Sequence, residues 1–186
     1  MHIQARKSEQ GFTLVELLIV VIILAIMAAI AIPQFGSSTE DAKISTLETN
    51  LQQLRAAVEL YYHQHNTRYP GSYAETDGTT ATATAGAAQT AFIAQLTQYT
   101  DKNGKVAGVK DATFKYGPYI KKLTLPKNPF LTGASAVGVL ADITSNDITV
   151  APTVDGTTGW KFFVKLGRMV ANDNTTLSDG TFTKDL

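Results

Sequence analysis

Glu16 is the residue whose type and position most need a chemical explanation, because it is the only ionisable side chain in the apolar run 12–32. A carboxylate near the centre of a membrane-spanning helix costs about 2.5–3.5 kcal/mol, and somewhat less toward the helix end. Such residues usually mark function. Burying Glu16 among Val15, Leu17 and Leu18 would be a pure cost without a partner, so we expect the carboxylate to pair with a cation.

Two other groups of residues could bind a metal ion. His63 and His65 lie two apart in a predicted helix, so their side chains face different directions and both are expected in solvent. Asp173 and Asp179 offer oxygen ligands, but their spacing does not reproduce a recognised calcium loop, and such residues also make ordinary turns. We therefore expect no metal or cofactor, with calcium at Asp173 and Asp179 as the alternative.

Catalytic and nucleic-acid-binding patterns are not found. The sequence has no metal-binding histidine helix, nucleophile elbow or phosphate-binding glycine loop, so we predict that the protein is not an enzyme. A group of lysines could form a basic strip, but neither interleaved aromatic residues nor net charge supports nucleic-acid binding. A solvated face is expected for Lys110, Lys115, Lys121, Lys122 and Lys127.

Length and composition limit the architecture. The 186 residues have room for one modest domain plus an extension, because domains commonly run to about 100–150 residues. The formal net charge is zero, so no field across the whole protein would draw it to nucleic acid or anionic lipid. Cysteine is absent, which excludes a disulfide framework, a thiolate metal site and a thiol nucleophile.

The apolar run 12–32 is long enough to cross a bilayer. About 21 residues at roughly 1.5 Å each span about 30 Å as a helix, which matches the hydrocarbon thickness. Arg6 and Lys7 precede the run, and no basic residue follows it as far as Glu40. The positive-inside rule therefore predicts a cytoplasmic start and an exported remainder.

Two ordinary interpretations of this run leave something unexplained. A secretory signal peptide would be cut near the small-x-small pattern at 29–31, but its apolar core usually spans about 7–15 residues and holds no carboxylate. A simple single-span anchor accounts for the apolar length and the charge asymmetry. It does not account for Glu16.

A third interpretation comes from the segment KSEQGFTLVEL at 7–17. It combines a short basic leader, Gly11, the aromatic Phe12, a glutamate four positions after Phe12, and an apolar helix. This pattern closely resembles the class III leader and processing site of type IV pilins and type II secretion pseudopilins. The resemblance covers about the first 35 residues, through Phe35.

The resemblance implies how these residues act. A prepilin peptidase would cut after Gly11 and N-methylate Phe12, leaving a charged amine at membrane depth. In the filament, Glu16 would pair with the Phe12 terminus of a neighbouring subunit, and such a buried pair is suited to fixing register. Pro33 removes a helix hydrogen bond and is expected to permit a bend or local melting of the helix.

The same resemblance implies partners and location. The partners would be copies of the chain, other pilin-like subunits, the prepilin peptidase, an inner-membrane assembly platform and membrane lipid. The chain would cross the bacterial inner membrane once, with its N-terminus cytoplasmic and its C-terminal domain periplasmic or extracellular, and would then enter the filament.

The remaining sequence predicts a small mixed domain. An amphipathic helix is expected over 39–65, with an apolar stripe of Ile44, Leu47, Leu51, Leu54, Val58 and Tyr61. The threonine- and alanine-rich segment 72–91 is expected to be a mobile loop, and a short helix is expected over about 89–99. Runs at 136–143, 148–154 and 160–166 predict three antiparallel strands covered by the stripe.

The expected fold class is α+β, with a long N-terminal helix packed on a small antiparallel β-sheet, as in the pilin fold. The helix would have a transmembrane half and an amphipathic half. The expected divisions are a leader (1–11), a transmembrane and assembly helix (12–35) and an exported globular domain (36–186). Within this domain, 66–101 would hold a loop and the short helix, and 102–186 a loop and the sheet. A fragment from Ser37 onward is expected to be a soluble, folded monomer.

A second resemblance concerns the middle of the chain. Segments 62–71, 117–123 and 126–130 are similar to the helix exit and the loop before the sheet in the major pseudopilin of type II secretion. The chain departs from that family near its end, because it lacks the leucine-glycine-alanine-aspartate-glycine stretch associated with a calcium-holding loop. Its threonine-rich insertion and long tail also differ.

These observations favour a type II secretion pseudopilin that polymerises through its N-terminal helix to drive protein secretion. The absence of cysteine points the same way, since many surface pilins close a C-terminal loop with a disulfide. Two alternatives stay open. One is a surface type IV pilin for adhesion, motility or DNA uptake, and the other is an exported binding module or enzyme on a pilin-like anchor.

Overall fold

The structure is a computed structural model that describes the backbone of 12–186 and the side chains of 12–29 and 39–186. The predicted leader 1–11 lies outside the described residues. Backbone contacts divide the chain into two compact units, one ending at Asp41 and the other spanning Ala42–Leu186.

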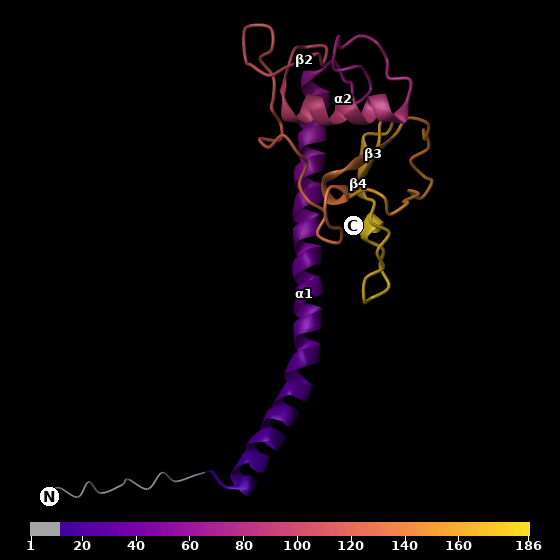
Figure 1. Ribbon diagram of the computed structural model, residues 1–186. Helices are drawn as coiled ribbons and strands as arrows, with labels where there is room; N and C mark the ends of the chain where they lie inside the picture. Colours follow the sequence, from indigo (N-terminus) through magenta and orange to yellow (C-terminus); the bar gives the residue numbers. More distant parts are fainter. Residues whose placement is uncertain (1–11) are drawn as a thin grey trace, which may run out of the picture. The chain divides into compact units, whose positions relative to one another are not determined.

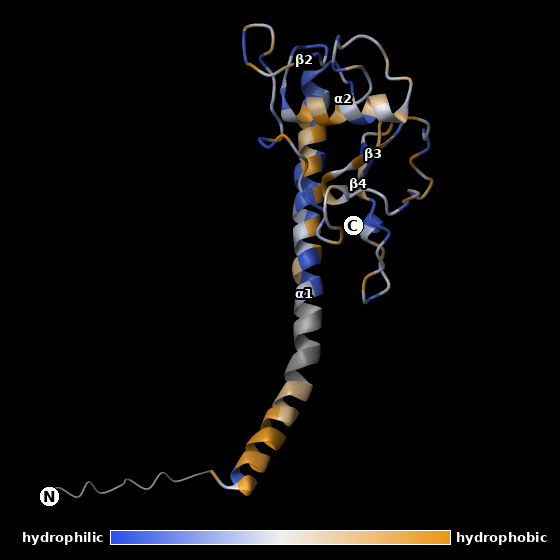
Figure 2. Cartoon of the chain, viewed as in Figure 1, coloured by the Kyte–Doolittle hydropathy of each residue, from blue (hydrophilic) through white to orange (hydrophobic). Residues whose placement is uncertain are grey.

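Helix α1 (Leu14–Gln64) contains the apolar run from Leu14 onward and the amphipathic segment as far as Gln64 (Figure 1). Its first turns are strongly apolar, whereas polar residues appear along its later part (Figure 2). Within the residues whose side chains are described, no helix is both long and apolar enough to cross a membrane. Pro33 lies inside the assigned helix, and the bend expected there stays a prediction.

The amphipathic stripe of α1 is confirmed by burial. Its members from Leu47 onward are at most 2 % exposed, whereas Ile44 at the start of the stripe is half-buried. The stripe belongs to a core that also contains α2 (Ala85–Thr97) and the inner side of the sheet. Spacings of three and four residues therefore identified the face of α1 that packs against the domain.

Helix α2 begins earlier than expected and replaces the last third of the predicted loop. Thr84 caps its start by accepting a hydrogen bond from the backbone nitrogen of Ala87 at 3.2 Å. Ala88 and Ala91 are fully buried, because small side chains let the helix backbone approach its neighbours closely. The prediction of a loop through residue 91 was wrong. It assumed that a segment without bulky apolar residues does not pack, whereas the small alanine side chains of this segment are buried.

The main sheet has the order β3-β4-β5, with β3 at Val139–Asp142, β4 at Trp160–Phe163 and β5 at Arg168–Ala171. Strands β4 and β5 are antiparallel, and β3 runs parallel to β4. A second, two-stranded antiparallel sheet pairs β1 (Tyr99–Thr100) with β2 (Val106–Ala107). Short 3-10 helices occupy Ser135–Val137 and Thr183–Asp185. The α+β class is confirmed, and the main sheet is mixed rather than wholly antiparallel.

The run 148–154 forms no strand, which corrects the prediction for this segment. Pro152 cannot donate a ladder hydrogen bond, and the Thr153 carbonyl accepts from the Lys161 ammonium instead of from a strand.

The third strand is β5, which follows a tight turn at Gly167. Gly167 has φ +66°, and a Cβ there would lie 2.2 Å from Tyr69 Cζ, so this turn needs glycine.

Candidate assembly site at the start of the N-terminal helix

Thr13 and Glu16 form a reciprocal cap at the start of α1. The Glu16 backbone nitrogen donates to Thr13 Oγ1 at 3.2 Å. In return, Glu16 Oε2 accepts from both the Thr13 backbone nitrogen and the Thr13 hydroxyl, each at 2.9 Å. This is a capping box, in which the N-cap residue and the third helical residue satisfy each other's backbone donors. Glu16 therefore has a local structural role as well as the predicted one.

The two carboxylate oxygens of Glu16 differ in their contacts with the described residues. Oε1 accepts no hydrogen bond from any residue in the described part of the chain, whereas Oε2 is held by Thr13. A carboxylate offers about four acceptor positions, so capping does not use up its capacity. The box fixes the direction of the side chain through Oε2, while Oε1 keeps its acceptor capacity with respect to the described residues.

The apolar surface around this carboxylate is exposed. Phe12 is 88 % exposed, and every large apolar side chain that follows it on α1 as far as Met27 is at least 51 % exposed. Soluble monomers rarely expose contiguous apolar surface of this extent, and such surface usually marks contact with protein or membrane. The start of α1 therefore combines an oriented anionic group with a surface suited to association.

Sequence reasoning missed Thr13. The signal was present, because a threonine followed three residues later by a glutamate, just before an apolar run, is the sequence pattern of a capping box. Of the predicted processing residues, Gly11 lies outside the described residues and Phe12 is the first described one. Cleavage at Gly11 and methylation of Phe12 stay predictions.

His65 is buried, which corrects the expectation that both histidines face solvent. Its ring stacks on Tyr61 with centroids 3.8 Å apart, and Nδ1 lies 2.8 Å from the Tyr61 carbonyl. The carbonyl can only accept, so Nδ1 carries the hydrogen and Nε2 accepts from Thr100 Oγ1 at 2.9 Å. Thr100 of β1 and the rings of Tyr116 and Tyr119 lie against this imidazole, and the helix pattern alone could not show these contacts. His63 is exposed, as expected.

This environment predicts a pH-dependent stability. Burial lowers the pKa of His65 below its ordinary value of about 6.5, although hydrogen bonds and Asp101 act in the opposite direction. As pH falls below about 6.5, the unfolded chain binds the proton before the folded one, so the free energy of unfolding decreases. We expect the thermal midpoint of the wild-type protein to fall between pH 7 and pH 5.

His65→Gln should remove most of this fall, since no group at this position would then titrate. His63→Gln takes an exposed imidazole from the same helix and is the matched control, which should keep the wild-type profile. Thermal unfolding followed by circular dichroism at several pH values measures both. Equal pH dependence in the wild type and His65→Gln would contradict the assignment.

Asp173 accepts hydrogen bonds from several protein donors. Its Oδ1 accepts from the Thr175 backbone nitrogen at 2.9 Å and from Thr183 Oγ1 at 2.7 Å, and its Oδ2 accepts from Asn128. Asp179 lies in an exposed turn and accepts from the Thr181 backbone nitrogen at 2.8 Å. These bonds engage both oxygens of Asp173 and one oxygen of Asp179, and the expectation of no metal, with calcium as the alternative, stays a prediction. Among the described residues, no cluster of three metal-ligating side chains occurs.

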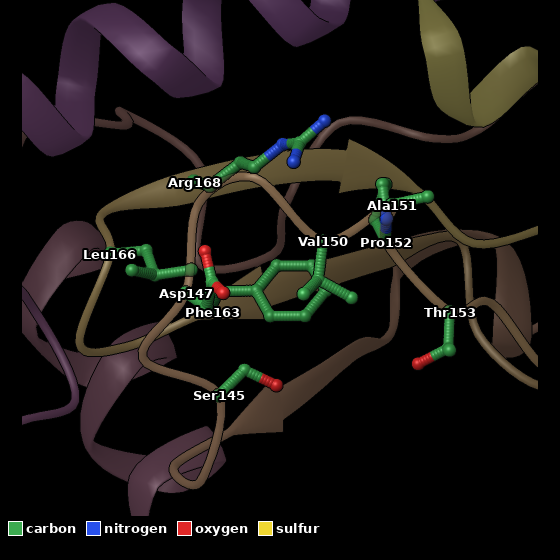
Figure 3. A pocket seen from close by; sticks show the side chains of 9 residues that line it. All are labelled: Ser145, Asp147, Val150, Ala151, Pro152, Thr153, Phe163, Leu166 and Arg168. Carbon is green, nitrogen blue, oxygen red and sulfur yellow. The ribbon is translucent and has the colours of Figure 1, made fainter.

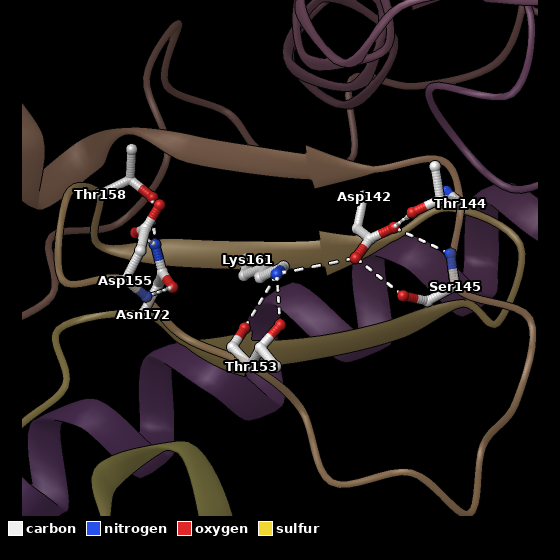
Figure 4. A network of polar contacts seen from close by, with 8 residues as sticks. All are labelled: Asp142, Thr144, Ser145, Thr153, Asp155, Thr158, Lys161 and Asn172. Carbon is white, nitrogen blue, oxygen red and sulfur yellow. Dashed lines mark hydrogen bonds and ion pairs between the residues drawn. The ribbon is translucent and has the colours of Figure 1, made fainter.

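A polar network fastens the segment between β3 and β4 to the sheet (Figure 4). The Lys161 ammonium donates to the Thr153 carbonyl at 2.8 Å and pairs with Asp142 Oδ2 at 3.6 Å. Burial raises the pKa of Asp142, but hydrogen bonds from Ser145 and Thr144 outweigh this and hold it below its usual range. At the other end, Asn172 donates to Asp155 Oδ1 at 2.7 Å. The network is structural, because its members bond to one another.

The pocket beside this network is too small for most ligands (Figure 3). It has a volume of about 70 Å³ and is lined by Phe163, Leu166, Arg168 and residues of the segment 145–153. Pockets for small molecules usually measure about 300–1,000 Å³. This hollow has room for a few water molecules.

Comparisons with known proteins agree with the geometry at the start of α1. Residues 6–32 match a family model described as the prokaryotic N-terminal methylation motif. The type II secretion system core protein G of Pseudomonas aeruginosa is 36 % identical over 67 residues, which cover 36 % of this chain and 46 % of that protein.

Fimbrial proteins match the chain as well. The type IV major fimbrial protein FimA of Dichelobacter nodosus is 45 % identical over 54 residues, covering 29 % of this chain and 35 % of that protein. A fimbrial protein of Neisseria meningitidis serogroup B is 38 % identical over 64 residues, covering 34 % of this chain and 37 % of that protein.

No solved structure matches the chain significantly. The chain spans less than half the length of the curated relatives described above. The resemblance to type IV pilins and pseudopilins is therefore confirmed by a methylation motif and by similarity to type II secretion protein G and type IV fimbrial proteins.

Proposed function

We propose that this chain is a structural subunit of a type IV pilin-like filament, and more specifically a type II secretion pseudopilin that polymerises through α1. The observation that carries the proposal is the start of α1. There, a carboxylate oriented by Thr13 lies at the start of a helix whose large apolar residues, as far as Met27, are at least half exposed. The methylation motif covers these same residues.

The exposed apolar surface at the start of α1 must be shielded from water both in the single subunit and in the filament. In the single subunit, we infer that lipid covers this surface. The run 12–32 contains one carboxylate and is otherwise uncharged, and as a helix it is about as long as the hydrocarbon layer is thick. In the filament, the same surface would pack against α1 of other copies, and Glu16 Oε1 would receive the amine of a neighbouring Phe12. Helices in lipid associate by close packing and polar contacts, so the charge pair would select the register.

Processing provides the direct test of this proposal. We expect the mature chain to begin at Phe12 with a methylated amine, because cleavage after Gly11 removes Arg6 and Lys7 and creates the cation that Glu16 needs. Intact mass and N-terminal peptide mass spectrometry of the membrane-purified subunit measure this. A mature chain beginning at Ile32 would restore the signal-peptide interpretation and reject the filament proposal.

A surface pilus is the second candidate, because fimbrial proteins match the same part of the chain. Deleting the gene separates the two functions. A pseudopilin mutant should retain secreted proteins inside the cell, whereas a pilin mutant should secrete normally and lose the filaments that shearing releases. Retention of secreted proteins is the result expected here.

A further inference from the structure

A groove runs between one flank of α1 and the segment 119–127. It has a volume of about 590 Å³, and α1 contributes Asn50 and Gln53 to its wall. Two hydrogen bonds fix the opposite wall to the helix. Asn50 Nδ2 donates to the Lys127 carbonyl at 2.9 Å, and Tyr119 donates to Gln64 Oε1 at 2.7 Å. The groove is therefore a built part of the domain rather than a gap beneath a loose loop.

The groove carries positive charge without an internal counter-ion. Lys121, Lys122 and Lys127 line it and are exposed, and no acidic residue is among its lining residues. In the described part of the chain, none of these three lysines forms an ion pair, since the ion pairs found there join other residues. A concave surface lined by one sign of charge concentrates its field and attracts an acidic partner.

The opposite flank of α1 is acidic. Glu48 and Glu59 are both exposed and lie eleven residues apart, which is about three helical turns, so they share one face. At about 100° per residue, that face lies roughly 110° to one side of the buried stripe, and Asn50 and Gln53 lie roughly 60–120° to the other. The acidic face and the basic groove of one chain therefore point away from each other.

Glu48 is the stronger of the two acidic contacts. Near Glu59, the side chains of Arg55 and Arg168 line the same hollow and offset its charge. Arg55 is committed to its own chain, because it donates to the carbonyls of Met169 and Leu186. No described basic side chain forms an ion pair with Glu48.

We propose that the groove receives the Glu48 flank of α1 from a second copy of this chain, an inference that rests on the proposed filament. Charge complementarity favours this occupant, and the two surfaces cannot meet within one molecule. Contacts between different surfaces of identical subunits do not close on themselves unless the rotation permits a ring, so they suit an open helical polymer. Such contacts mainly determine partner choice and register rather than total affinity.

Charge reversal and its compensation provide the test, using the full chain in cells that assemble the filament. Lys121→Glu with Lys122→Glu, and separately Glu48→Lys, should each lower the yield of sheared filaments about threefold or more, because exposed pairs are individually weak. Combining the three substitutions in one chain should restore most of the yield, since every copy would then present reversed but complementary surfaces.

Introduced cysteines give an independent measurement, because the chain has no cysteine of its own. Thr124→Cys lies in the groove, and Gln52→Cys lies on the exposed acidic face. The chain with both should form a ladder of covalent multimers on oxidation of assembled filaments. Either cysteine alone is the control and should give no ladder.

The outcomes separate this inference from the proposed function. Wild-type chains that form no filament reject the function itself. Wild-type filaments together with unchanged yields of the reversed variants and no ladder overturn the inference alone. If the lysine reversals abolish binding to double-stranded DNA and leave filament yield unchanged, the groove serves an anionic polymer and the inference is likewise overturned.

Discussion

Glu16→Ala subunits are expected to enter the membrane and to be cleaved normally, but to yield at least about tenfold fewer filaments than the wild type. Removing one partner of a buried ion pair typically costs about 3–5 kcal/mol, and 1.4 kcal/mol already corresponds to a factor of ten. The alanine leaves the apolar run longer, so insertion should not suffer. Filament yield is measured by comparing membrane-bound subunit with sheared or pelleted filament.

The capping box makes matched controls necessary, because Glu16→Ala also removes the bonds to Thr13. Thr13→Val keeps the shape of the side chain and the backbone donor, and it removes only the capping hydroxyl. It should cost about 0.5–2 kcal/mol in helix initiation and leave most of the filament yield. Glu16→Gln keeps the length and an acceptor oxygen but loses the charge.

The two controls distinguish a charge pair from a helix cap as the role of Glu16. If the charge pair governs assembly, Glu16→Gln should behave like Glu16→Ala, while Thr13→Val stays near the wild type. If Thr13→Val is as defective as Glu16→Ala, the carboxylate acts as a helix cap and the charge-pair account fails. Normal filaments from Glu16→Ala would mean that apolar packing alone determines the register.

Trp160→Ala is expected to cause the largest loss of folding stability in the domain. Trp160 is fully buried at the start of β4, and its indole nitrogen donates to the Pro126 carbonyl at 2.8 Å. Deleting a buried aromatic side chain costs about 3–5 kcal/mol, a large share of the stability of a small domain. Urea unfolding of a fragment beginning at Ser37, followed by circular dichroism, measures this.

Two substitutions calibrate the Trp160 result. Trp160→Phe retains an aromatic ring and loses the indole hydrogen bond, so it should cost less than the alanine. Leu123→Ala changes a side chain that is 77 % exposed, and it should shift the free energy of unfolding by no more than about 0.5 kcal/mol. A cost for Trp160→Ala as small as that of Leu123→Ala would show that β4 is not part of the folded core.

The sequence by itself determined the features that depend on local spacing. The leader pattern, the apolar run and the stripe of α1 are read from residues close together in the chain, and helix periodicity places the stripe on one face. The position of Glu16 in an apolar run also identified it as the residue to explain. The capping box was within reach of the sequence too, since Thr13 and Glu16 have its spacing.

Only the tertiary structure decided the features that depend on distant partners. The burial of His65 depends on Thr100, and in the segment 148–154 the Thr153 carbonyl bonds to Lys161 of β4, which in turn pairs with Asp142 of β3. The parallel pairing of β3 with β4 likewise joins strands separated by this segment. The residues in such contacts are far apart in the sequence and meet only when the chain between them closes into a loop, so no fixed spacing identifies them. Local propensity therefore could not predict them.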